Sequence, residues 1–245
     1  MSRLGLGLGL ARRIQIGSPP SIILPTGNLY TSPTQIGLAI TTPAQSPFAG
    51  GGNSYLFSSS VNSFLDIAPD QSWVVGTGDF TIEWFQNQST TDGFQRAFTV
   101  GDFPSITIGV SIETATFYYW AGNAFRYNSA SSTVINTWYH WAVVREGGVT
   151  RIYRNGVLRG SSIADTNNIN NSSSKLTIGN ENTPSTIAAF VGYITNVRWV
   201  KGLAVYTDAF TVPTSNLALV AGANPYGGTN TRAIPDGYTK LLLIP

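Results

Sequence analysis

The stretch from residue 138 to residue 159, WYHWAVVREGGVTRIYRNGVLR, contains two tight turns between segments of alternating residues. Every second position of the first segment is occupied by Trp138, His140, Ala142 and Val144. A period of two is typical of an extended strand, so these side chains are expected to share one face. Glu146-Gly147-Gly148 and Asn155-Gly156 supply residues that tolerate the positive φ of two-residue hairpin turns. Three successive antiparallel strands are therefore predicted.

Strand character continues on both sides of this meander. Phe80, Ile82 and Trp84 share one strand face, with Thr81 and Glu83 on the other. Further short strands are expected over residues 63–67, 105–110, 115–120, 175–178 and 192–199. Many short strands without helical periodicity predict an all-β fold, an antiparallel two-sheet jelly-roll sandwich over residues 50–218. Its expected core includes Phe80, Ile82, Trp84, Trp138, Ala142, Val144, Ile194 and Val197.

Composition narrows the class of protein further. Charged residues make up 11% of the chain, well below the roughly 25% of an ordinary soluble domain. A formal net charge of +2 is too small to indicate a nucleic-acid partner or a membrane surface. With no cysteine, neither disulfides nor thiolate metal sites can form. No apolar run approaches the roughly 20 residues of a membrane span, and Arg12 and Arg13 follow the Leu4–Leu10 stretch where a signal peptide would be cleaved.

Four segments, in order along some 140 residues, resemble the family of concanavalin A-like (laminin-G-like) lectin and glucanase domains. They are residues 76–85 (GTGDFTIEWF), residues 136–156 with their W-x-H and Y-x-N-G elements, residues 176–179 (LTIG) and residues 190–198 (FVGYITNVR). The resemblance implies the same concanavalin A-like sandwich. It does not by itself imply an activity, because this fold carries lectins, glycanases and inert scaffolds.

The next stretch, residues 200–214 (VKGLAVYTDAFTVPT), is similar to the ending of such domains in phage structural proteins. That likeness implies a non-enzymatic virion protein, in a capsid decoration, tail or fibre, that is assembled in the host cytoplasm and displayed on the virion surface. Such a protein can also adhere to a host-surface glycan. The alternative is a secreted or cell-surface carbohydrate-binding module or lectin.

Hydrolysis of a glucan requires two neighbouring carboxylates, which are spaced about 5 Å apart in retaining enzymes. Glu83, Glu113, Glu146 and Glu181 are each isolated from other acids on their strands. His140, the only histidine, is expected to be buried and hydrogen-bonded. The sequence therefore predicts no catalytic residues.

The densest aromatic cluster is the place where a saccharide ring can stack. Its candidate residues for glycan binding are Tyr118, Tyr119, Trp120 and Tyr127. The alternative is that these rings fill the core, as most aromatic side chains do in sandwiches.

Calcium is the one cation that the sequence leaves open. Asp165, Asn167, Asn168 and Asn170 offer oxygen ligands, although Asn-rich loops are more often turns. We therefore expect no cofactor and no metal site, with calcium as the alternative.

Residues 1–49 form a glycine- and proline-rich extended N-terminal arm, and residues 219–245 a C-terminal extension. The apolar residues that face one way on the extended arm are Leu4, Leu6, Leu8, Leu10, Ile14 and Ile16. Such a row can dock on other virion chains or on further copies of this chain, as in a homo-oligomer. The alternative is a flexible leader. We expect residues 1–45 to be ordered only against another chain.

Overall fold

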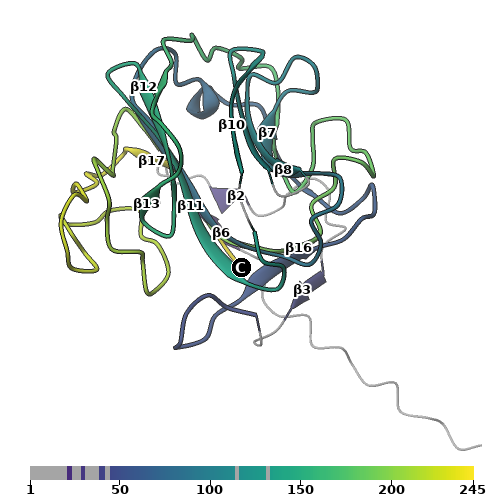
Figure 1. Ribbon diagram of the computed structural model, residues 1–245, viewed down its shortest axis with the longest axis horizontal. Coiled ribbons are helices and arrows are strands. Elements are labelled where there is room, and N and C mark those ends of the chain that lie inside the picture. Colours follow the sequence, from purple (N-terminus) through teal and green to yellow (C-terminus); the bar gives the residue numbers. More distant parts are fainter. Residues whose placement is uncertain (1–20, 24–28, 31–38, 42–44, 114–115, 131–132) are drawn as a thin grey trace, which may run out of the picture.

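The computed structural model describes residues 21–23, 29–30, 39–41, 45–113, 116–130 and 133–245. It is a sandwich of two antiparallel β-sheets (Figure 1). In these ranges the only helix is the three-residue 3₁₀ turn η1 (Gln71–Trp73), and no helix is long and apolar enough to cross a membrane. The expected all-β, two-sheet fold is confirmed.

The large sheet has eight strands in one path. Its order is β13 (Val157–Leu158), β12 (Val149–Arg154), β11 (Trp138–Glu146), β6 (Phe80–Gln88), β16 (Gly192–Lys201), β17 (Thr239–Ile244), β1 (Ser21–Ile23) and β2 (Leu29–Tyr30). Three strands lie off this path: β14 (Ile163–Ala164) beside β12, β4 (Ser54–Phe57) beside β16, and β3 (Ala39–Thr41) beside β4.

The small sheet packs against the large one. Its order is β10 (Ala124–Ala130), β9 (Thr116–Ala121), β8 (Ile108–Glu113), β7 (Phe94–Val100), β15 (Leu176–Ile178) and β5 (Leu65–Ile67). We call the face of each sheet that meets the other sheet its inner face, and the opposite one its outer face.

The two predicted hairpin turns are present. Gly147 and Gly148 have φ of 55° and 75°, and Asn155 and Gly156 have φ of 50° and 75°. Two successive positive φ values define the turn whose twist suits a two-residue hairpin. β11, β12 and β13 accordingly pair as the predicted meander.

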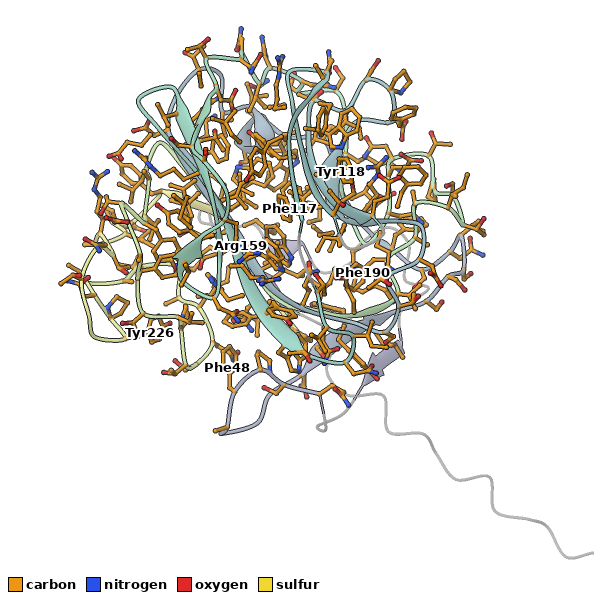
Figure 2. All side chains as sticks on the ribbon, viewed as in Figure 1. Phe48, Phe117, Tyr118, Arg159, Phe190 and Tyr226 are labelled. Carbon is orange, nitrogen blue, oxygen red and sulfur yellow. The ribbon has the colours of Figure 1, made fainter. Side chains whose placement is uncertain are left out.

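Aromatic rings from both sheets meet in the core between the inner faces. Phe117 of the small sheet stacks on Trp141 of the large sheet with ring centroids 4.5 Å apart. Phe98 makes edge contacts with Trp84 at 5.4 Å and with Trp199 at 6.0 Å. Figure 2 shows Phe117 near the middle of the molecule. Phe80, Ile82, Trp84, Ile194 and Val197 belong to this core, as the sequence predicts.

Three other expected core residues lie elsewhere. Ala142 and Val144 share the outer face of β11 with His140, and they belong to a second apolar cluster under Tyr206 and Phe210. Trp138, on the same face, is only partly buried. The predicted shared face is correct, but its assignment to the core between the sheets is wrong. A sheet that is buried on both faces has apolar residues in both phases, so alternation cannot tell the two faces apart.

The expected domain boundaries also shift. β17, which lies inside the predicted C-terminal extension, pairs with β16 on one side and with β1 on the other. The sandwich therefore continues past residue 218.

The N-terminal arm also differs from the expectation. β1 and β3, inside the expected arm, pair with strands of the same chain. The prediction that residues 1–45 are ordered only by another chain is therefore wrong for these two strands. Leu4, Leu6, Leu8, Leu10, Ile14 and Ile16 lie outside the described residues.

Arg145 is a buried cation on the inner face of β11. Its guanidinium donates to the carbonyl oxygens of Gly76 (2.7 Å), Gly78 (2.8 Å) and Asn167 (2.9 Å), and it lies 4.9 Å from the ring centroid of Phe80. One side chain thus ties two loops to β11.

We expect Arg145→Met to reduce the free energy of unfolding by at least about 3 kcal/mol, because each buried carbonyl that loses its donor costs about 1–3 kcal/mol. Arg151→Met is the matched control. Arg151 lies on the same hairpin, but its ion pair with Glu146 is partly exposed, so its loss should cost less than about 1 kcal/mol. Urea denaturation of both variants measures the difference, and equal losses would contradict this role of Arg145.

Candidate functional site

Glu83 is the acidic residue buried most completely on the outer face of the large sheet. Its Oε1 accepts hydrogen bonds from Arg198 Nε (2.8 Å) and Nη2 (2.5 Å). Its Oε2 accepts one from the hydroxyl of Tyr206 (2.7 Å) and lies 3.0 Å from His140 Nε2. His140 is therefore buried and paired, as the sequence predicts.

Burial alone would raise the pKa of Glu83. The positive charge of Arg198 and the hydrogen bonds from His140 and Tyr206 outweigh that effect and lower the pKa to about 2. A general acid in glycoside hydrolysis needs the opposite, a raised pKa and access to the substrate. Glu83 has neither, because protein groups occupy both of its oxygens. This arrangement suits a structural role.

Two of the four calcium candidates, Asp165 and Asn167, form an internal hydrogen-bond network, whereas Asn168 and Asn170 are exposed. The carboxylate of Asp165 is buried and accepts from Tyr119 Oη (2.9 Å), Thr150 Oγ1 (2.9 Å) and Asn167 Nδ2 (2.6 Å). Asn167 Oδ1 in turn accepts from Arg126 Nη2 at 2.5 Å. Oxygens with protein donors this close do not fit a calcium ion. Across the described residues, no group of three His, Cys, Asp or Glu side chains could hold a metal ion.

Strand alternation divides the four aromatic candidates for glycan binding. Tyr118 and Trp120 lie on the outer face of β9 and are partly exposed. Tyr119 points inward, is fully buried and donates to Asp165. Tyr127 also faces inward, packs against the core and donates to the carbonyl of Arg159. The structure therefore does not bring Tyr119 and Tyr127 together with Tyr118 and Trp120 on one surface.

Three phenylalanines join Tyr118 and Trp120 on the outer face of the small sheet. Phe103 is 60% exposed and lies 5.8 Å from Trp120, edge to face. Phe125 is 43% exposed and lies 5.6 Å from both Trp120 and Tyr118. Phe94, on β7, is 41% exposed. We call Phe94, Phe103, Tyr118, Trp120 and Phe125 the aromatic surface.

Arg96 is the cation beneath this surface. Its guanidinium carbon lies 5.8 Å from the ring centroid of Phe94 and 5.9 Å from that of Trp120. Nη1 donates to Ser111 Oγ at 2.9 Å. Arg96 is only 4% exposed, yet none of the described residues accepts a hydrogen bond from its Nε, and the same holds for Trp120 Nε1. Partly exposed aromatic rings that gather over a buried cation make this the candidate binding site.

Arg96, Phe94 and Phe103 are not among the residues that the sequence patterns indicate. Phe94 and Arg96 are two residues apart, a spacing that puts both on one strand face and could have indicated their association. The bulge that follows Arg96 on β7 obscures this alternation. Phe103 reaches Trp120 from the loop between β7 and β8, and no sequence pattern indicates that contact.

The chain belongs to the concanavalin A-like lectin/glucanases superfamily, whose model matches residues 50–228. This family membership agrees with the sandwich and with the resemblance seen in the sequence. The search of curated proteins found no matching sequence.

Solved structures show the same fold at low identity. Domain 4 of AbnA, an extracellular arabinanase from Geobacillus stearothermophilus solved with arabinotriose, is 16% identical with a TM-score of 0.50, over 76% of this chain and 84% of that one. The tailspike protein 2 of Escherichia coli O157:H7 bacteriophage CAB120 is 13% identical, with a TM-score of 0.48, over 68% of this chain. This chain spans only 26% of the tailspike's length.

A further similar structure is the CBM40 domain of the Ruminococcus gnavus IT-sialidase, bound to α2,3-sialyllactose. It is 12% identical, with a TM-score of 0.43, over 54% of this chain and 85% of that one. The likeness to domain 4 of AbnA concerns the fold alone, so the ligand has to be argued from this chain's own residues.

The Glu83 cluster generates a pH prediction. The pKa of Glu83 is lower in the folded chain (about 2) than its ordinary value of 4.5, so its stabilising contribution is complete above about pH 5 and is lost as the pH falls toward 2. Glu83→Gln should be less stable than the wild type by about 3–5 kcal/mol at pH 7, because Arg198 stays buried without its counter-charge. That gap should narrow as the pH falls to 2.

Urea denaturation at several pH values measures the gap. Glu146→Gln, which removes a partly exposed carboxylate paired with Arg151 and Arg232, should differ from the wild type by less than about 1 kcal/mol throughout. A gap for Glu83→Gln that stays constant from pH 7 to pH 2 would contradict the assignment.

Proposed function

We propose that this chain is a non-catalytic, saccharide-binding sandwich that acts as an adhesin. The observation that carries the proposal is the aromatic surface around Arg96, where partly exposed rings pack over a buried cation. Aromatic faces stack on the apolar C–H faces of sugar rings, and a few polar groups among them orient the sugar. The lectin-like fold agrees with this function.

A non-enzymatic role is supported by the carboxylates. On the large sheet, both carboxylate oxygens of Glu83 already accept hydrogen bonds from protein groups. On the small sheet, Glu113 lies on β8, and Glu181 follows β15, the other neighbour of β7. β8 and β15 lie on either side of β7, so their backbones are about 9–10 Å apart. Retaining hydrolysis needs two carboxylates about 5 Å apart, and this placement does not suit such a pair. Glycan hydrolysis that disappears in Glu113→Gln would contradict the proposal.

We expect Trp120→Ala to weaken saccharide binding at least about tenfold, because it removes the ring that contacts Phe103, Phe125 and Arg96. Trp138→Ala is the matched control, since Trp138 is a partly exposed tryptophan on the outer face of the other sheet, 6.4 Å from Tyr193. A glycan array followed by calorimetric titration measures both variants. If Trp138→Ala loses binding and Trp120→Ala retains it, the site is on the wrong sheet.

We further propose that a virion displays this adhesin, with residues 1–17 attaching it to other virion chains or to copies of itself. The support is the likeness of residues 200–214 to phage structural proteins. Tyr206 and Phe210, within that stretch, stack at 3.6 Å and cover the outer face of the large sheet. The alternative is a secreted or cell-surface carbohydrate-binding protein, and mass spectrometry of purified particles against the culture medium separates the two locations.

Deletion of residues 1–17 should leave the sandwich folded, because every described strand begins at or after Ser21. We expect an unchanged circular dichroism spectrum and thermal midpoint, together with loss of incorporation into particles or oligomers. Sedimentation of assembled material measures the second effect. Normal assembly of the truncated chain would contradict the role of Leu4, Leu6, Leu8, Leu10, Ile14 and Ile16.

A further inference from the structure

Arg96 already has two carboxylates near its charge. Glu181 Oε2 lies 3.8 Å from Arg96 Nε. Glu113 lies diagonally across the β7–β8 pair, because Glu113 pairs with Phe94 while Ser111 pairs with Arg96. Burial lowers the pKa of Arg96, and both carboxylates oppose that lowering. One positive and two negative charges therefore leave the surroundings of Arg96 negative.

The other charged groups on this face do not reverse that balance. Lys175 and Asp66 form their own ion pair beside β15 and β5. Asp102 accepts hydrogen bonds from the backbone N–H and the hydroxyl of Thr183. Arg126, next to Phe125 on β10, directs its guanidinium to the carbonyl of Ala121 and to Oδ1 of Asn167.

Two partly buried carboxylates, Glu113 and Glu181, border the aromatic surface. Burial raises the pKa of Glu113, and the charge of Arg96 opposes that rise. Glu181 Oε2 accepts only a long bond of 3.5 Å from the N–H of Phe103 among the described residues. A sugar hydroxyl can donate to a carboxylate. The carboxylate of an acidic sugar only accepts, and it adds a third negative charge.

We infer that the aromatic surface binds uncharged saccharides and excludes sugars that carry a carboxylate. Glu113 and Glu181 accept hydrogen bonds from sugar hydroxyls, and Trp120 stacks on the ring, with the buried Arg96 beneath it. This inference rests on the saccharide binding proposed above and defines its ligand class. The two acidic residues supply the repulsive element that specificity against close analogues requires.

The experiment uses the full chain and pairs of oligosaccharides that differ only at C6, where one member has a hydroxymethyl group and the other a carboxylate. One such pair is an oligomer of galactose and the corresponding oligomer of galacturonate. Another is an oligomer of glucose and the corresponding oligomer of glucuronate. Titration at pH 7 should show at least about tenfold tighter binding of the uncharged member. Glu113→Gln and Glu181→Gln should each reduce that preference about tenfold, because each removes one nearby negative charge. Glu146→Gln, the same change on the large sheet, should leave it unaltered.

The outcomes separate the two proposals. Equal or tighter binding of the acidic members by the wild type overturns the inference and leaves saccharide binding intact. A preference that survives both Glu113→Gln and Glu181→Gln also overturns it. If the folded protein binds no member of any pair, the proposed function fails and the inference fails with it.

Discussion

Glu83 carries a negative charge at the centre of a sheet that is buried on both faces, and much of the molecule is arranged around it. A buried carboxylate is strongly unfavourable unless opposite charge and hydrogen bonds compensate it. Its partners come from β11 (His140), from β16 (Arg198) and from the segment after β16 (Tyr206). One carboxylate thereby fixes three adjacent strands and the segment that covers them. Tyr206 and Phe210 cover the outer face of the large sheet around Glu83, whereas Tyr118 and Trp120 on the small sheet stay partly exposed.

Two buried arginines show how the same side chain can serve the fold or a ligand. Arg145 donates to three backbone carbonyls, so its hydrogen-bonding capacity is used within the chain. Arg96 is almost as buried, yet its Nε has no acceptor among the described residues and aromatic rings flank its guanidinium. A charge whose donors are all used within the chain stabilises the fold, whereas Arg96 lies under partly exposed rings that can contact a ligand. This contrast is the physical basis of the proposed function.

The aromatic residues are divided between these tasks by strand phase. On β9, Phe117 and Tyr119 face the core, and Tyr118 and Trp120 face outward. Neighbouring residues of one strand thus supply the packing between the sheets and the candidate ligand surface. The core packing holds β9 against the large sheet, and this gives the outward rings a rigid support.

The sequence by itself determined the sandwich and the local geometry of its hairpins. Gly147-Gly148 and Asn155-Gly156 specify tight turns through their own backbone preferences, and alternation correctly grouped His140 with Ala142 and Val144. Only the tertiary structure decided that this group faces away from the other sheet, because residues some 60 positions further along the chain cover it. The same holds for Arg96, whose partners come from other strands and loops. Turns and alternation depend on neighbours in the chain, whereas burial, charge balance and an unused donor depend on contacts between distant residues.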